Sequence, residues 1–97
     1  MIEPEQCQTM AEVRTGVDAL DRQIVALLAR RFRFMDAAAR IKPTRDKVRD
    51  EERKSAVLQH VRRDAAAAGA PAEVIAGVYD SLVEASIAYE LKRFDAR

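Results

Sequence analysis

The chain has 97 residues, and its 17 lysines and arginines nearly balance 16 aspartates and glutamates, for a formal net charge of +1. That balance argues against a general nucleic-acid-binding protein. The single cysteine, Cys7, excludes an internal disulfide and a zinc site built from thiolates. No apolar run approaches the length of a membrane span or precedes a cleavage site, so we expect one domain, residues 1–97, working in the cytoplasm.

An irregular lead-in over residues 1–11 comes first, and a long helix follows over about residues 13–41, with Thr9 suited to its N-cap. An apolar stripe with heptad-like spacing runs along this helix and is interrupted only at Arg31. The stripe consists of Val13, Val17, Leu20, Ile24, Leu27, Arg31, Phe34, Ala38 and Ile41. One helix cannot cover its own stripe, so partner helices or a second subunit must do so.

A polar connector over residues 42–47 separates the long helix from the second one. Pro43 ends the long helix because it disfavours helical geometry in the residue before it and has no N–H to donate. We place the second helix over about residues 48–68, with Thr44 or Asp46 as its N-cap.

The third helix is expected over about residues 71–94. Gly69 suits the position just after the second helix, and Pro71 suits the first turn of the third. Its apolar stripe comprises Ile75, Val78, Leu82, Ala85 and Tyr89. Since no strand pattern occurs, the sequence predicts an all-α fold with one long and two shorter helices.

Three cations are spaced along the long helix, and they are the first candidate ligand-binding residues. Arg31 interrupts the apolar stripe, where a guanidinium is costly unless an anion meets it. Arg14 and Lys42 flank the two ends of the stripe. We interpret the three as holding an anionic small molecule inside a helical bundle, not necessarily from one copy of the chain. The alternatives are a snorkelling Arg31 and solvated surface charges at the other two positions.

Polar residues on the other helices complete the candidate set. Ser86 and Glu90 lie one turn apart among apolar neighbours and should point inward. We interpret Glu90 as a protonated carboxyl that donates a hydrogen bond, the alternative being an ion pair with Arg93 or with an arginine of the long helix. Asp50 and Arg53 begin the second helix, where helix-dipole and surface pairing is the alternative to ligand binding.

The remaining chemistry-bearing residues favour no other class of site. His60 is the only histidine and has no cysteine or second histidine to share a metal, while Cys7 has no histidine at a predictable distance. The chain also lacks a glycine-rich phosphate loop. We therefore expect a catalyst without cofactor or metal, working by positioning and electrostatics.

In order and spacing, these elements resemble the all-helical AroQ-type chorismate mutases. The residues that carry the resemblance are Val13-Arg14, Asp18, Asp21, Leu27 to Arg31, Lys42, Val48 to Arg53 and Ser86 to Glu90. It covers about residues 10–94. Within the family, the opening Pro4-Glu5-Gln6-Cys7 and the short connector are most similar to the isochorismate-pyruvate lyases.

The resemblance implies an intertwined homodimer of three-helix chains with two active sites, each shared between subunits. Arg14 would reach into the partner's site, while Arg31 and Lys42 bind the two carboxylates of a dicarboxylate substrate. Lys42 would also lie near the ether oxygen whose bond to carbon breaks, and Glu90 would face that oxygen. Asp50 and Ser86 would position the ring and a carboxylate, with Arg53 in support.

Departures from the family pattern affect which activity is expected. Many bacterial relatives have glutamine where this chain has Glu90. A glutamate can serve there only when it is protonated, so we expect the activity to be favoured by mildly acidic pH. Lys54 replaces an acidic residue of typical mutases, whereas Asp50 and Ser86 are mutase-like and differ from the lyase branch. We expect a chorismate mutase, with isochorismate-pyruvate lyase as the first alternative. A non-catalytic helical dimer and a helical nucleic-acid binder are alternatives from other classes.

Overall fold

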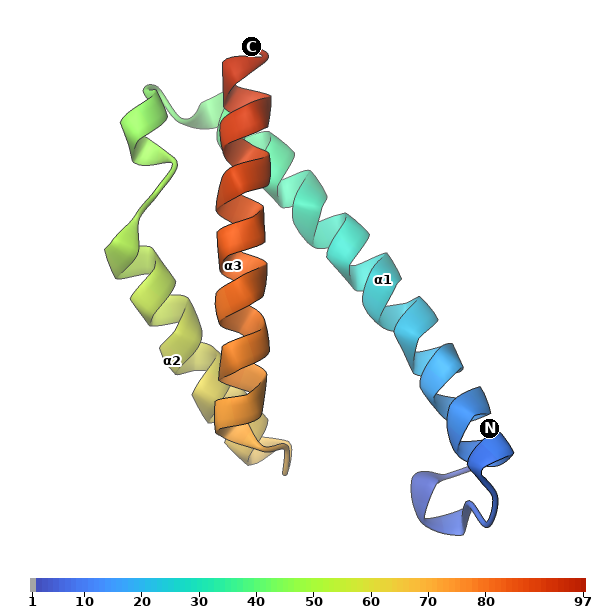
Figure 1. The fold of residues 1–97 in the computed structure, drawn as a ribbon. Coiled ribbons are helices and arrows are strands. Elements are labelled where there is room, and N and C mark those ends of the chain that lie inside the picture. Colours follow the sequence, from blue (N-terminus) through green and yellow to red (C-terminus); the bar gives the residue numbers. More distant parts are fainter. Residues whose placement is uncertain (1) are drawn as a thin grey trace. The chain divides into compact units, whose positions relative to one another are not determined.

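The computed structural model describes residues 2–97 and shows an all-helical chain (Figure 1). Met1, the first residue of the predicted lead-in, lies outside the described residues. The elements are η1 (Pro4–Gln6), α1 (Met10–Ile41), η2 (Arg45–Lys47), α2 (Glu51–Ala67) and α3 (Ala72–Asp95). No strand occurs over residues 2–97, which confirms the predicted all-α class with one long and two shorter helices. None of the helices in this range is both long and apolar enough to cross a membrane.

The chain divides into a first unit that ends at Arg33 and a second unit, Phe34–Arg97. In the first unit, reciprocal hydrogen bonds begin α1: the Glu12 N–H donates to Thr9 Oγ1 and the Thr9 N–H donates to Glu12 Oε1, both at 3.2 Å. This capping box confirms Thr9 as the N-cap. The apolar stripe beyond it is uncovered, with Leu20 48% and Leu27 67% exposed.

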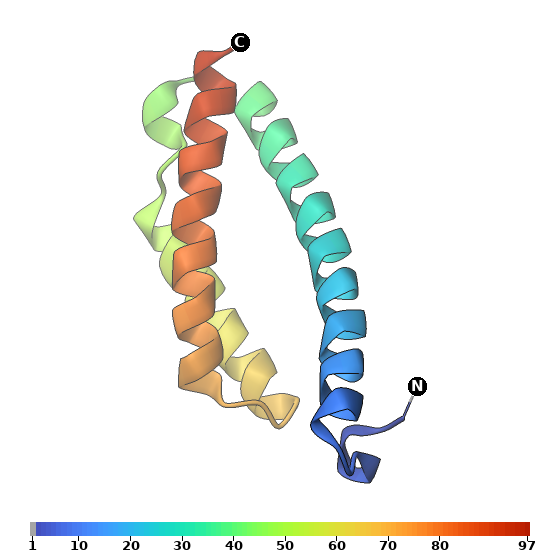
Figure 2. The ribbon, with the colours of Figure 1, turned by 45° about the vertical axis from the view of Figure 1, so that its right-hand side comes forward.

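In the second unit, α2 and α3 form a hairpin and lie side by side in both views (Figures 1 and 2). The turn between them begins at Gly69, which has φ +76°, as predicted for the residue that follows the helix. The Ala70 N–H donates to the Ala65 carbonyl at 2.8 Å, and the Gly69 N–H donates to the Ala66 carbonyl at 3.1 Å. This pair of bonds is a Schellman motif, which satisfies the last carbonyls of α2 and turns the chain back toward α3.

The predicted start of α2 was wrong by about three residues. Residues 45–47 form the separate turn η2, with Thr44 as its N-cap, and Val48 is buried with only 3% of its surface exposed. The N-cap of α2 is Asp50, whose Oδ1 accepts the Arg53 N–H at 2.9 Å. Asp50 is in the extended conformation, so the helix begins only at the residue after it.

Small side chains form the contact face of α3. Its buried residues are Ala76, Val83, Ser86 and Glu90. The apolar stripe expected from the sequence is not this face, because Val78 and Ala85 are exposed and its other members are only half-buried. Alanine, valine and serine allow α2 to approach closely, whereas the larger residues of the stripe lie to the sides. Within a single chain, α3 therefore leaves much of its apolar surface uncovered.

Candidate active site

Lys42 lies at the end of α1 and connects this helix with α3. Its backbone N–H still donates to the Ala38 carbonyl, at 2.9 Å, and Pro43 follows directly. The ammonium donates to Glu90 Oε2 at 2.7 Å and to the Val48 carbonyl at 3.3 Å. The side chain of Glu90 is 5% exposed and that of Lys42 is 29% exposed. The pair therefore has a buried carboxylate and an ammonium with partial access from outside.

Glu90 and Ser86 lie one turn apart on α3, and each residue is 4% exposed, so the prediction that both point inward is confirmed. Ser86 Oγ donates to the Leu82 carbonyl at 2.7 Å. The ion pair of Glu90 is with Lys42 and not with Arg93, whose Nε lies 3.0 Å from Asp36 Oδ1. Removing the partner of a buried carboxylate strongly destabilises the folded protein. The contact with Lys42 therefore fixes the geometry at the end of α1.

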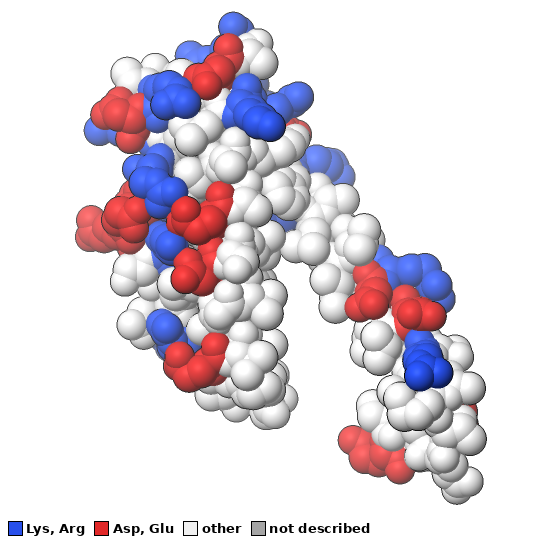
Figure 3. Space-filling view, viewed as in Figure 1, with Lys and Arg blue, Asp and Glu red and all other residues white. Residues whose placement is uncertain are grey.

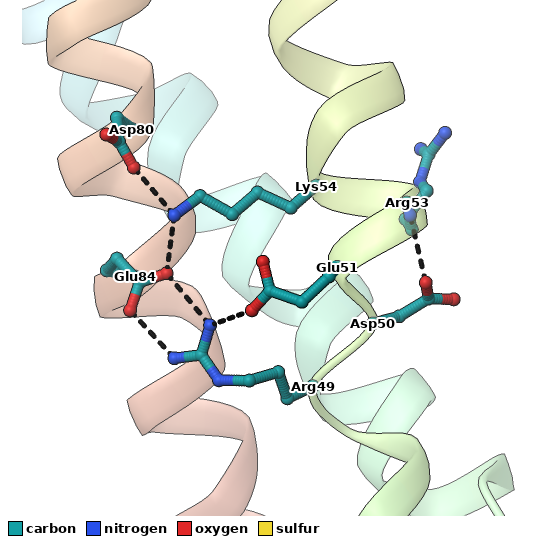
Figure 4. A network of polar contacts seen from close by, with 7 residues as sticks. All are labelled: Arg49, Asp50, Glu51, Arg53, Lys54, Asp80 and Glu84. Carbon is teal, nitrogen blue, oxygen red and sulfur yellow. Dashed lines mark hydrogen bonds and ion pairs between the residues drawn. The ribbon is translucent and has the colours of Figure 1, made fainter.

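Asp50 and Arg53 are in contact, but the contact is made by the backbone N–H of Arg53 and not by its guanidinium. The Asp50 carboxylate caps α2 by accepting the Arg53 N–H, and both residues are exposed. Figure 4 shows them on the side of α2 that faces away from α3. Helix capping thus accounts for their contact, where the alternative weighed from the sequence was helix-dipole and surface pairing. A role of the two residues in substrate binding stays a prediction.

Arg14 and Arg31 belong to the first unit, whereas the other candidate residues belong to the second. Arg14 is exposed and Arg31 is half-buried in the surface of α1. Convergence of these two guanidiniums with Lys42 around one ligand stays a prediction.

The residues considered for metal or thiol chemistry lie elsewhere. His60 is exposed on α2, and Cys7 is a half-buried free thiol in the lead-in. Over residues 2–97, no three side chains of histidine, cysteine, aspartate or glutamate are grouped so as to hold a metal ion.

Comparison with known proteins places the chain in a family. The family model for chorismate mutase type II matches residues 13–91. The chain belongs to this family. An isochorismate pyruvate lyase of Pseudomonas aeruginosa is 32% identical to it over 89 residues, which cover 92% of this chain and 88% of the relative. Both findings confirm the resemblance stated from the sequence, including its lyase-like branch.

In this chorismate mutase family member, a network of ion pairs that the sequence analysis missed joins the start of α2 to α3 (Figure 4). The Arg49 guanidinium donates to both oxygens of Glu84, at 2.7 and 3.1 Å, and to Glu51 at 2.7 Å. Lys54 Nζ lies 2.9 Å from Glu84 and 2.8 Å from Asp80. The signal in the sequence was the spacing of the two acids, one helical turn apart on α3, opposite the basic start of α2.

The network gives Lys54, a departure from the family pattern, a structural role. The adjacent Arg49 and Lys54 lower the pKa of Glu84 from 4.5 to about 2. Asp80 and Glu84 in turn raise the pKa of Lys54. Basic and acidic side chains interleave over this side of α2 (Figure 3). The network therefore holds the start of α2, which follows the connector, against α3.

Glu84→Gln tests this tie through its pH dependence. The folded-state pKa of Glu84 is lowered, so its ionised form stabilises the fold above pH 4.5, and that contribution disappears as the pH falls toward about 2. We expect wild-type protein to exceed the variant in free energy of unfolding at neutral pH, and the difference to vanish over that acidic interval. Urea unfolding at a series of pH values measures this difference in free energy of unfolding, with Glu52→Gln in the first turn of α2 as the control. A difference that is independent of pH would contradict the pairing.

Proposed function

We propose that the protein is a chorismate mutase, which rearranges chorismate to prephenate without a cofactor. The observation that carries the proposal is the contact between Lys42 and Glu90, in a chain that belongs to the chorismate mutase type II family. A buried carboxyl and a partly exposed ammonium 2.7 Å apart offer two polar hydrogen-bonding groups at one point. The substrate of this reaction needs such groups at its ether oxygen.

The reaction breaks a carbon–oxygen bond and forms a carbon–carbon bond within one molecule, with no net proton transfer. Negative charge develops on the ether oxygen as its bond breaks, and a preorganised donor at that oxygen stabilises the transition state more than the substrate. Lys42 supplies one donor. Glu90 accepts from Lys42 in the ligand-free protein, so it becomes a second donor only after it takes up a proton.

The carboxylates of the substrate would be held by guanidiniums. We assign Arg31 to one carboxylate and Lys42 to the other, with Arg14 contributed by a second copy of the chain. These contacts select the compact conformer in which the two reacting carbons are close. Ser86, beside Glu90 on the buried face of α3, and Asp50 would position the ring and a carboxylate, with Arg53 in support.

A second copy is proposed because a single chain has too little interior. Its buried apolar residues are Ala39, Val48, Ala65, Ala76 and Val83, and over residues 2–97 no large side chain is fully buried. The stripe of α1, meanwhile, is exposed at most of its large apolar positions. Exposed apolar area of this extent is typical of a subunit interface. We infer an intertwined homodimer, with small-molecule dicarboxylates and no nucleic acid or membrane as partners, acting in the cytoplasm.

Isochorismate-pyruvate lyase is the second candidate. The relative from Pseudomonas aeruginosa carries this name and matches nearly the whole chain. The same pair of groups would serve it, since that reaction also breaks a bond to an ether oxygen and gives salicylate and pyruvate. We favour the mutase over the lyase because Asp50 and Ser86 are the residue types expected of the mutases at these positions.

Assays of the purified protein with chorismate and isochorismate, offered separately, test the function. We expect prephenate from chorismate as the faster reaction. Lys42→Ala should lower kcat/KM by about 10²- to 10³-fold, because it removes the donor at the ether oxygen. Lys47→Ala, in the exposed turn η2, is the matched control and should retain activity. Faster salicylate formation from isochorismate would replace the mutase by the lyase, and no turnover of either substrate would support a non-catalytic dimer.

Glu90→Gln tests the carboxyl at the same point. Glutamine donates a hydrogen bond at every pH, whereas glutamate donates only when protonated. We expect wild-type kcat/KM to fall as pH rises and the variant to keep its activity over a wider range on the alkaline side. Rate profiles against pH for both proteins measure this, with the exposed Glu73→Gln as control. Identical profiles for Glu90→Gln and wild type would remove Glu90 from the mechanism.

A further inference from the structure

Asp95, the last residue of α3, and Arg97, two residues beyond it, hold the segment that carries Lys42. Arg97 Nη1 donates to the Lys42 carbonyl at 2.7 Å and to the Ala39 carbonyl at 3.4 Å. Three residues past Lys42, the Arg45 guanidinium donates to both oxygens of Asp95, at 2.9 and 3.3 Å. Two adjoining points of the chain, one on each side of Pro43, are thus tied to the same end of α3.

The contact of Arg97 has a clear physical cause. The last carbonyls of an α-helix have no partner within the helix, and a cation there also meets the negative end of the helix dipole. Pro43, with no N–H, does nothing for these carbonyls, so the guanidinium supplies the missing donors. Its orientation is supported by the Phe94 ring, whose centroid lies 4.2 Å from the guanidinium carbon.

Arg97 therefore acts on the residue whose ammonium contacts Glu90. The carbonyl of Lys42 is held by Arg97, and its side chain is held by Glu90 and by the Val48 carbonyl. We propose that Arg97, together with the Arg45–Asp95 pair, is a positioning device that fixes the Lys42 ammonium at the reacting oxygen. The proposal rests on the mutase function given above. A displacement of about 1 Å at a reacting group is enough to lower a rate by up to 100-fold.

A hollow lies beside this contact, and we propose no ligand for it. It has a volume of about 360 Å³ and is lined by Asp36, Ala39, Arg40, Arg93, Ala96 and Arg97. Arg93 is paired with Asp36, and Arg97 donates to two backbone carbonyls. The ends of α1 and α3 also bring partial negative charge to this place. Arg93 and Arg97 are thus already engaged in contacts between the end of α1 and the end of α3.

Arg97→Gln in the 97-residue chain tests the proposal, with two readouts. The first is amide hydrogen exchange over residues 40–48, which we expect to be about tenfold faster in the variant because the helix end loses its cap. The second is turnover, for which we expect kcat to fall about tenfold while KM changes less, because Lys42 meets the oxygen less well in the transition state. Arg97→Lys, which keeps the positive charge and N–H donors but not the planar guanidinium, should recover part of both effects.

Arg62→Gln is the matched control, since Arg62 is also an ion-paired arginine of the second unit, 3.0 Å from Glu73, but is on α2 away from the connector. It should leave exchange over residues 40–48 and kcat unchanged. Asp95→Asn, which releases the second tether, provides an independent variant if Arg97→Gln does not fold. Unchanged exchange and unchanged kcat in both tether variants would overturn the proposal, as would a loss of kcat without faster exchange. Wild-type protein that turns over neither substrate would refute the function, and the exchange readout would still test the tether.

Discussion

The ion pair between Lys42 and Glu90 is the interaction on which the second unit depends. It joins the end of α1 to the last of the buried residues of α3, with 2.7 Å between Lys42 Nζ and Glu90 Oε2. A carboxylate as buried as Glu90 needs a cation at that point, because leaving it unpaired costs several kcal/mol. The local sequence provides the partner: Pro43 ends α1 just after Lys42, and the connector brings the Val48 carbonyl to the same ammonium. The fold requires Lys42 and Glu90 to contact each other, whereas the proposed chemistry requires both to donate hydrogen bonds to the substrate.

In the proposed mechanism, the two demands would fall on Glu90 at different stages. Without ligand, the carboxylate balances the ammonium and stabilises the end of the helix. In the proposed reaction the ammonium turns to the substrate, and the carboxyl becomes a donor by taking up a proton. A member of the family with glutamine at this position would not need that proton, but it would also lose the charge that holds Lys42 in the free protein. In the ligand-free protein, Glu90 therefore has a structural role as the partner of Lys42.

The remaining polar contacts hold the polypeptide around this pair. The network of Arg49 and Lys54 with Glu84 fixes the start of α2 on α3, after the connector. Before the connector, Arg97 holds the end of α1, and Asp95 at the end of α3 holds the start of η2. Most of these groups are exposed, so each pair taken alone is worth little. Their value is that they act from both sides on a short segment with few apolar contacts of its own.

Local chemistry made much of the fold predictable. Thr9, Pro43 and Gly69 each act through their own backbone or cap, and the predicted ends at these positions were correct to within a few residues. The start of α2 was misplaced because several residues before Glu51 are suitable caps, and the choice depends on the burial of Val48.

Contacts that depend on how the helices lie together were harder to predict. Glu90 was expected to face inward, but its partner Lys42 is 48 positions away in the chain. To predict the ion pairs of Glu84, one likewise needs to know how α2 and α3 are aligned along each other. The periodicity of a single helix does not give that alignment. For the same reason the shared site of Arg14, Arg31 and Lys42 stays a proposal.

Mixing two inactive variants tests that shared site most directly. If Arg14 of one copy completes the site built on Lys42 of the other, then Arg14→Ala and Lys42→Ala proteins, unfolded together and refolded as an equal mixture, form mixed dimers with one intact site. The account predicts recovery of about a quarter of wild-type turnover, since half of the dimers are mixed and each carries one of two sites. If both proteins are inactive alone and their refolded mixture remains inactive, the account is contradicted.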